Sequence, residues 1–364
     1  MVEPTPPPDG RVGRGLSLAA GFGISALFLY LTFRGIDLAK MRDSLSRVNY
    51  PMLSVPLAMF ALHFTLRAMR WGVFIRPLGT VSLLDRQAAT VIGFATNNLL
   101  PFRLGEFARA YVLTTKSGIP FPASFATVAL ARIFDILALG VVFVALMLVF
   151  PLPPAAKSGG LVAIPACLGI LGFLIALKLR EAQALAFLEA VLRAFPQALA
   201  GVIRRLVRSF LPGLESVASA WDLLRAFGLS LATWALIVVY NSTMIRAYGL
   251  DLPWYTSLLI VTFLAVAISV PQAPGYWGVY QGAVVLSVGM VPGAQVSDED
   301  AAGFALLLHG CQFLLTTLWG VYYLMRGHVS LKGILAARSS TGTAPQPDAQ
   351  EPRVPEGDDA TRSS

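Results

Sequence analysis

The sequence predicts an all-α polytopic membrane protein with about six spanning helices and two re-entrant helical hairpins in an inverted-topology repeat. Composition is the first observation behind this prediction, because 56% of the 364 residues are hydrophobic and only 13% are charged. Soluble domains carry about 25% charged residues, so a chain this apolar belongs in a bilayer. The other two observations are long apolar runs flanked by basic loops, and a proline and glycine motif that occurs twice.

About six apolar runs approach the roughly 20 residues that an α-helix needs to cross a bilayer. Each is expected to be a helix, because lipid offers no hydrogen-bond partner to exposed backbone groups. The first run follows Arg11 and Arg14 and reaches Arg34 without a small-residue cleavage signal, so we expect a retained helix and not a signal peptide. The runs are 15–33, 51–67, 124–150, 161–179, 227–245 and 302–325.

Lysine and arginine concentrate in loops beside the apolar runs, so the net charge of +8 indicates membrane topology and not nucleic-acid binding. The loop 180–225 and the segment after Met325 are basic, which places both in the cytoplasm. Counting the runs then puts both termini on the cytoplasmic side of the cell membrane. The basic loop 34–50 is the exception, because it falls outside; its spacing is compatible with an interfacial amphipathic helix.

These patterns divide the chain into a cytoplasmic segment 1–14, a membrane domain 15–336 and a disordered cytoplasmic tail 337–364. Within the membrane domain we expect repeat A at about 51–150 and repeat B at about 227–326. The connecting loop 180–225 is predicted to form one or two amphipathic helices, broken at Pro196 and Pro212. The two cysteines, Cys167 and Cys311, lie in separate apolar segments, which argues against a disulfide framework or a metal cluster.

Two further stretches, 86–115 and 255–291, are each a pair of short apolar segments broken at a proline and glycine motif. Neither half is long enough to span comfortably, so each stretch is predicted to be a re-entrant hairpin. The first would enter from the inside and the second from the outside, which is typical of transporter repeats. The breaks read PFRLGEFARAYVL and PGYWGVYQGAVVL, and the predicted tips contain Pro101, Gly105, Pro274, Gly275 and Gly278.

Ionisable side chains inside a membrane are rare, because each costs a few kcal/mol to insert, so they usually face a cavity or a partner. Five such residues are expected to line one cavity near the midplane and to hold a polar, anionic head group. Arginine suits a phosphate because its planar fork donates two hydrogen bonds. The alternative is internal pairing, of Arg132 with Asp135 and of Glu106 with Arg103 or Arg109. The five residues are Arg103, Glu106, Arg109, Arg132 and Asp135.

Repeat position adds three polar residues to the candidate substrate site. His309 and Gln312 stand three residues apart, as Arg132 and Asp135 do, and Gln281 follows the second break. On their own, a membrane histidine and glutamine most often make hydrogen bonds between helices.

A further basic group, Arg67, Arg70 and Arg76, ends the run 51–67. Anchoring at the cytoplasmic interface is the favoured interpretation, with capture of lipid phosphate second. Trp71 fits the aromatic belt of the same interface, so Arg67, Arg70 and Trp71 are expected to be interfacial lipid contacts.

Four segments together resemble the flippase-like family, which comprises the transmembrane region of lysylphosphatidylglycerol synthases and its stand-alone relatives. They read RAMRWGVFIRPLG, NNLLPFRLGEFARAYVL, ARIFD and PQAPGYWGVYQ, and the resemblance covers about residues 15–330. Phe102 and Tyr276 stand where the family motifs have glycine, and Gln281 stands where the second motif has glutamate. The resemblance implies a membrane domain that moves a lipid between leaflets; bifunctional relatives also carry a soluble aminoacyl transferase domain.

The favoured function is therefore a lipid translocase that binds a polar, anionic head group without covalent chemistry, catalytic residues, cofactor or metal. Its partners would be a membrane lipid and separately encoded enzymes of lipid synthesis. An inverted repeat equally suits a small-solute or ion transporter. A membrane-embedded transferase that uses a lipid-linked donor, with Glu106 or Asp135 as base, is the third candidate. Because no catalytic motif or synthase domain is evident, the sequence predicts that the chain is not an enzyme.

Overall fold

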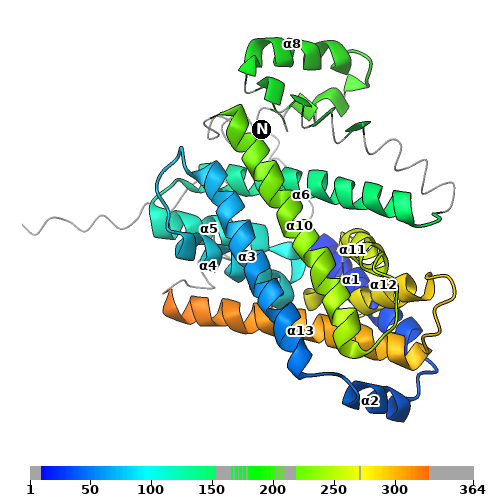
Figure 1. The fold of residues 1–364 in the computed structure, drawn as a ribbon. Coiled ribbons are helices and arrows are strands. Elements are labelled where there is room, and N and C mark those ends of the chain that lie inside the picture. The colour runs from blue at the N-terminus through cyan, green and yellow to red at the C-terminus, as the bar shows by residue number, and fades with distance from the viewer. Residues whose placement is uncertain are drawn as a thin grey trace, which may run out of the picture.

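The computed structural model describes residues 10–152, most of 165–207, 219–269 and 272–327, with side chains from Gly21 onward except that of Phe102. Every regular element in these ranges is a helix (Figure 1). The predicted span 161–179 lies partly outside the described residues, and Cys167, Pro212 and the predicted tail 337–364 lie wholly outside them. The long helices are α1 (Gly10–Phe33), α3 (Ser54–Ile75), α6 (Phe121–Val149), α10 (Ala220–Tyr248) and α13 (Asp298–Arg326).

Shorter helices and 3-10 turns lie between the long helices. They are α2 (Leu38–Ser46), α4 (Leu83–Leu99), α5 (Gly105–Ser117), α8 (Glu181–Leu192), α11 (Thr256–Ala267) and α12 (Val279–Gly289), with 3-10 turns η1 (Pro51–Leu53), η2 (Pro101–Arg103) and η3 (Pro274–Tyr276). Helix α2 falls in the loop where an interfacial helix was compatible with the spacing, and α8 falls in the predicted amphipathic loop.

Four of the described helical segments are long and apolar enough to cross a membrane: Pro51–Ile75, α6, α10 and α13. A fifth results if Gly21–Phe33 and Leu38–Ser46, which meet at 82°, are counted as one broken span. The all-helical membrane fold is thus confirmed. The count of six and the inverted repeat stay predictions.

Serine and aspartate start three of these helices in the same way. Ser82, Ser219 and Ser297 each accept a hydrogen bond from the backbone N–H three residues on, at 3.0, 3.2 and 3.0 Å. The residue at that third position is aspartate in every case, and its carboxylate accepts from the serine hydroxyl. Both contacts satisfy polar groups that a helix N-terminus leaves unpaired, so the sequence Ser-x-x-Asp sets the start of α4, α10 and α13.

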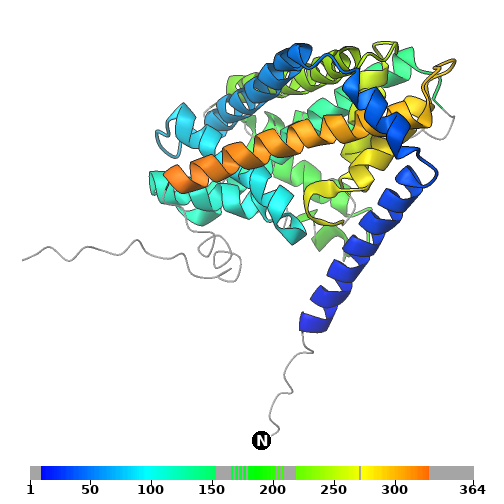
Figure 2. The ribbon, with the colours of Figure 1, turned by 90° about the horizontal axis from the view of Figure 1, so that it is seen from below.

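Apolar clusters join ends of the four apolar spans (Figures 1 and 2). One apolar cluster joins the C-terminal halves of α3 and α13 to the N-terminal parts of α6 and α10. A second cluster joins the opposite ends of α3, α10 and α13. Helices α3 and α13 therefore run opposite to α6 and α10, as the predicted topology requires for the four apolar spans.

Two pairs of short helices, α4 with α5 and α11 with α12, lie at opposite ends of this bundle and each pair packs on itself (Figure 1). Both predicted breaks are present, because η2 begins at Pro101 and η3 at Pro274. Helix contacts of the first half have equivalents in the second half. The contact of α3 with α4 corresponds to that of α10 with α11, and the contact of α5 with α6 to that of α12 with α13. The contact of α4 with α13 corresponds to that of α11 with α6. This matching supports the predicted repeat.

The first pair closes through two glycines. Gly93 on α4 and Gly105 at the start of α5 face each other so closely that a methyl group on Gly105 would overlap the Gly93 carbonyl and the Asn97 side chain. The Asn97 carboxamide oxygen also accepts from the Gly105 backbone N–H at 2.7 Å. Small residues give such close helix contacts in membranes, so Gly105 fixes the angle of the hairpin.

Replacing Gly105 by alanine should therefore lower the melting temperature of the purified protein in detergent, because the added methyl group forces α4 and α5 apart. Gly228→Ala in α10 is the matched control, since the Gly228 position faces open space and alanine favours the helix. An unchanged melting temperature for Gly105→Ala would show that this contact is not needed.

If both pairs are re-entrant, the two ends of each pair share one side of the membrane. Single cysteines at Ser82 and Lys116, in a background with Cys167 and Cys311 changed to alanine, should react with an impermeant thiol reagent from one face. Cysteines at Asp251 and Pro292 should react from the other face. Labelling of positions 82 and 116 from opposite faces would contradict the hairpin.

Candidate functional site: a basic cavity between two helix breaks

Asp135 on α6 is the centre of a buried ion-pair network. Its Oδ2 accepts from Arg67 Nη1 at 3.0 Å and its Oδ1 from Arg70 Nη1 at 2.6 Å, and both arginines lie on α3. Trp234 on α10 donates its indole N–H to the same Oδ1 at 3.3 Å. The side chains of all three charged residues are 8% exposed or less, so the pairs form in a low-dielectric interior.

This network joins three spanning helices. Arg70 also donates from Nη1 to the Ser230 hydroxyl of α10 at 3.0 Å. Arg67 donates from Nε to His63 Nε2 at 2.8 Å, and His63 Nδ1 lies 3.5 Å from the Thr233 carbonyl oxygen, which fixes the tautomer of His63. Along α3, the residues His63, Arg67, Arg70 and Trp71 are separated by four, three and one positions. This spacing places all four on one face of the helix, which faces α6 and α10.

Arg132 has a different main partner from the one that helix spacing suggests. Its Nη2 donates to the Glu106 carboxylate at the start of α5, whereas the Asp135 carboxylate lies 3.9 Å away. The pair bridges α6 to the first helix break. Phe94 lies between this arginine and Arg67, with its ring centre 5.9 Å from the Arg132 guanidinium and 5.1 Å from that of Arg67.

Arg109 is buried behind the break and stacks on Trp71, with its guanidinium carbon 3.9 Å from the ring centre. Its Nε and Nη2 have no hydrogen-bond partner, and the same holds for Nε and Nη2 of Arg70. The Trp71 indole N–H donates to Thr127 on α6 at 2.9 Å. A cation–π contact thus replaces an acid as the partner of Arg109.

At the second break, hydrogen bonds between uncharged groups take the place that the Arg132–Glu106 ion pair has at the first. The Gly278 backbone N–H donates to Gln281 Oε1 at 2.7 Å, and Gln281 Nε2 donates to His309 Nδ1 at 2.8 Å. His309 stacks on Tyr280 with ring centres 4.3 Å apart. The histidine of α13 therefore holds the second break as Arg132 of α6 holds the first.

The two breaks meet. Arg103 Nη1 donates to the Ile268 carbonyl oxygen at the end of α11, at 3.2 Å, and α4 packs against η3. Arg103 and Tyr276 are the two non-glycine residues with positive φ in the described chain, at 51° and 63°. Each stands two residues after the break proline, so the two breaks share an uncommon backbone conformation.

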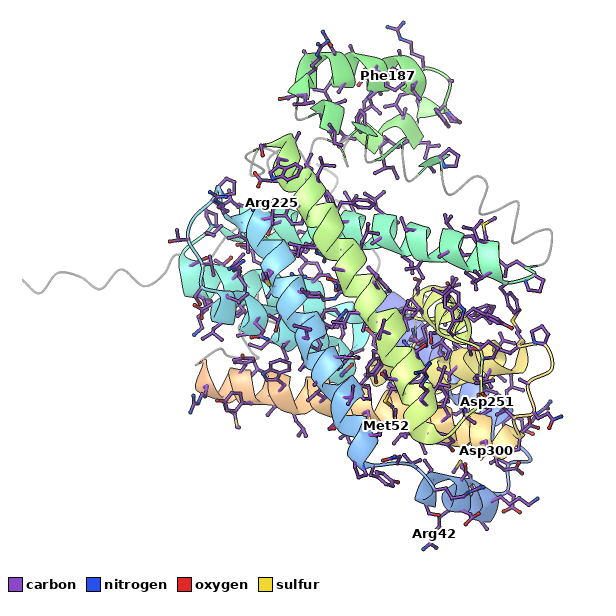
Figure 3. All side chains as sticks on the ribbon, in the orientation of Figure 1. Arg42, Met52, Phe187, Arg225, Asp251 and Asp300 are labelled. Carbon is purple, nitrogen blue, oxygen red and sulfur yellow. The ribbon has the colours of Figure 1, made fainter. Side chains whose placement is uncertain are left out.

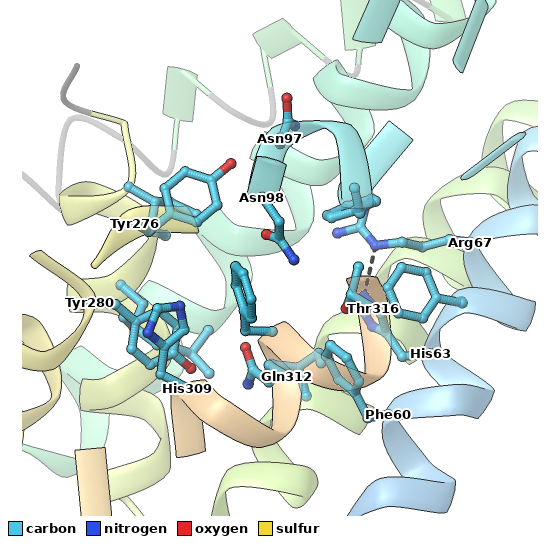
Figure 4. A pocket seen from close by; sticks show the side chains of 18 of the residues that line it. Phe60, His63, Arg67, Asn97, Asn98, Tyr276, Tyr280, His309, Gln312 and Thr316 are labelled. Atoms are coloured by element: carbon cyan, nitrogen blue, oxygen red, sulfur yellow. Dashed lines mark hydrogen bonds between the residues drawn. The ribbon is translucent and has the colours of Figure 1, made fainter. Parts of the chain in front are cut away.

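Between the breaks lies a cavity of about 190 Å³ (Figure 4). Helices α3, α4, α6, α10, α11 and α13 contribute to its wall together with Tyr276 and Tyr280. Three arginines, Arg67, Arg103 and Arg132, reach it from three different elements. With Arg70 and Arg109 behind them, five arginines face two carboxylates, Glu106 and Asp135, so the site has an excess of positive charge.

The predicted substrate residues divide into two layers. Arg103, Arg132, His309 and Gln312 line the cavity, whereas Glu106, Arg109, Asp135 and Gln281 stand behind them as partners or supports. Of the predicted tip residues, Pro101 and Pro274 begin the 3-10 turns, while Gly275 and Gly278 have φ of 73° and 84°. Internal pairing, the alternative interpretation, accounts for Asp135, but its main partners are Arg67 and Arg70.

The expected interfacial position of Arg67, Arg70 and Trp71 is wrong. They are 4%, 0% and 0% exposed, because the face of α3 that carries them turns toward Asp135 and Arg109 and away from lipid. Sequence reasoning also missed His63, Asn98, Trp234, Tyr276 and Tyr280, which line the cavity. The spacing of His63, Arg67, Arg70 and Trp71 on one helix face was the signal that pointed inward.

Fold and site together define a polytopic helical membrane protein with a basic cavity between two broken helix pairs. The chain belongs to the lysylphosphatidylglycerol synthase TM region family, whose model matches residues 18–320. The resemblance seen in the sequence is thereby confirmed.

One relative is glycosyltransferase AglD of Haloferax volcanii, which is 27% identical over 356 residues. The match covers 88% of this chain and 56% of the relative, so the chain spans about half the length of that protein. The prediction that the chain is not an enzyme is contradicted by this relative, which is named for a transferase activity.

The Asp135 network yields a stability prediction. Asp135→Asn should lower the free energy of unfolding by about 3–5 kcal/mol, because it leaves Arg67 and Arg70 buried without a counter-charge. Asp43→Asn is the control, since its ion pair with Arg47 is 72% and 66% exposed and contributes little. Denaturant titration in detergent measures both. Equal stability of Asp135→Asn and the parent would mean that the network is not stabilising.

Proposed function

We propose that this chain is the membrane part of a transferase that acts on a lipid-linked substrate, with the lipid phosphate held in the cavity. The observation that carries the proposal is the convergence of Arg67, Arg103 and Arg132 on one partly apolar cavity, with more arginines than acids around it. The planar guanidinium group of arginine binds phosphate oxygens through paired hydrogen bonds, and the electrostatic attraction is strongest where water is excluded. The family and the transferase name of one relative support it.

In transfer of a sugar from a lipid phosphate, the bond between the sugar carbon and the phosphate oxygen breaks, and the phosphate leaves with the electron pair. Arginines placed at that oxygen stabilise the developing charge. The acceptor hydroxyl forms the new bond and gives up its proton to a base. Asp135 is unsuited to that role because Arg67, Arg70 and Trp234 already occupy its oxygens. We therefore assign the proton to Glu106, which stands behind Arg132 and whose side chain is 21% exposed, against 8% for Asp135.

Binding of a prenyl phosphate and of the matching prenyl alcohol to the protein in nanodiscs tests the phosphate claim. The phosphate should bind at least about tenfold more tightly, and Arg132→Ala should weaken its binding about ten- to hundredfold. Arg132→Lys should recover part of the affinity, since lysine lacks the bidentate fork. Lys40→Ala, an exposed residue of α2, is the control. Equal affinity for phosphate and alcohol would falsify the proposal.

Transfer of labelled sugar from the prenyl phosphate to an acceptor tests the chemistry separately. Glu106→Gln should keep phosphate binding and lose transfer, because glutamine can still accept a hydrogen bond from Arg132 but cannot accept a proton. Full transfer by Glu106→Gln would remove this residue from the reaction.

Lipid translocation is the second candidate, favoured by the meeting of two broken helix pairs from opposite ends of the bundle at one central cavity. A midplane site between such pairs can open to each side in turn. Movement of a fluorescent lipid between leaflets of reconstituted vesicles, with Arg103→Ala as the inactive variant, distinguishes it from transfer.

We also propose that the molecule lies in the cell membrane with both termini in the cytoplasm. The ends of α3, α10 and α13 that carry Arg76, Arg225 and Arg326 lie together, whereas Asp251 and Asp298 belong to the opposite end. Apart from helix α2, whose Arg42 lies at the same end as Asp251, this distribution agrees with the positive-inside rule (Figure 3).

A further inference from the structure

A second cavity, of about 320 Å³, lies at the basic end of the bundle and shares no residue with the central cavity. We call it the Arg76 pocket; it forms where the end of α3, the start of α4 and the start of α10 come together. Its polar lining consists of Arg76, Thr80, Arg86, Asp222 and Arg225.

The pocket has an excess of positive charge. Its single acid, Asp222, lies 3.9 Å from Arg225, and its other oxygen accepts from the Ser219 hydroxyl at 3.0 Å. Asp222 is thus committed to the N-terminal end of α10, where a carboxylate also pairs with the helix dipole. Three arginines against this one acid leave two positive charges available to a ligand.

One arginine is held rigidly and two are free to move toward a ligand. Arg86 donates from Nη1 to the Ala68 carbonyl oxygen at 3.1 Å and from Nε to the Ser82 carbonyl oxygen at 3.3 Å. The Arg86 side chain lies directly against α3 at Gly72, where a methyl group would overlap the Arg86 guanidinium. Arg76 is exposed, and the side chain of Arg225 is 57% exposed.

Exposed apolar side chains surround this charge. Met69, a lining residue, is 44% exposed, and Leu224 and Trp221 beside Arg225 on α10 are 45% and 64% exposed. Tryptophan gathers at the level of lipid head groups, and apolar side chains next to arginines match a molecule with a charged head and hydrocarbon chains. A free phosphate would use the arginines and leave the apolar rim without a partner.

We propose that the Arg76 pocket is a binding site for the phosphate of an anionic membrane lipid, separate from the substrate cavity. Arg76 and Arg225 contact the phosphate, Arg86 forms the fixed wall, and the acyl chains lie against Met69 and Leu224. The bound lipid stabilises the contact between α3 and α10 at this end.

Native mass spectrometry of the purified protein, titrated with phosphatidylglycerol or phosphatidylcholine, tests this proposal. Each arginine near an anionic surface contributes about 1 kcal/mol, so Arg76→Gln with Arg225→Gln should weaken phosphatidylglycerol binding about thirtyfold. Phosphatidylcholine, whose choline cation offsets its phosphate, should bind more weakly to the parent protein and lose less affinity in the double variant. Arg42→Gln, on the exposed helix α2 at the other end of the fold, is the matched control with unchanged affinity (Figure 3).

Inorganic phosphate added in large excess should fail to displace the lipid; displacement at equal concentration would overturn the lipid assignment in favour of a free-anion site. Parent-like phosphatidylglycerol binding by the double variant would overturn the site itself. If the double variant does not fold, Arg225→Gln alone decides, with an expected loss of about fivefold. Prenyl phosphate binding in the central cavity should stay unchanged in both variants, so this test is independent of the proposed function.

Discussion

The rest of the structure depends on one constraint: the buried carboxylate of Asp135 must be neutralised by cations that are themselves buried. Arg67 and Arg70 meet it from α3, and this fixes α3 against α6 and α10. Because both Asp135 oxygens are used there, Arg132 is directed to Glu106, which in turn sets the position of the first helix break. The charge that remains in excess is positive and faces the cavity.

The two helix breaks are held in place by different kinds of interaction. On α6 a charged pair, Arg132 with Glu106, holds the first break, whereas on α13 a neutral chain from His309 through Gln281 to Gly278 holds the second. Positive charge is consequently concentrated on one side of the cavity, while aromatic rings of Tyr280 and Trp277 pack around His309 on the other. Such a site can orient a molecule that has an anionic end and an uncharged end.

Much of the fold could be predicted, because apolar length and helix-breaking prolines act locally: four of the six predicted spans and the breaks at Pro101 and Pro274 lie where the sequence placed them. The site was harder, because partner choice is a tertiary property. Arg67 and Arg70 have the pattern of interfacial anchors; their shared helix face hinted at burial, but the acid that pairs with them is set by the packing of α3 on α6. Helix spacing paired Arg132 with Asp135, yet Glu106 on a neighbouring element competes for it. The transferase link came from a relative and not from any motif.

The central claim is that the cavity between the breaks holds a lipid phosphate, and an experimental structure with a bound prenyl phosphate tests it most directly. The account predicts phosphate density within hydrogen-bond distance of the Arg103 and Arg132 guanidinium groups, with the prenyl chain leaving the cavity between helices. Phosphate density outside the cavity, with Arg132 still paired only to Glu106, would contradict it.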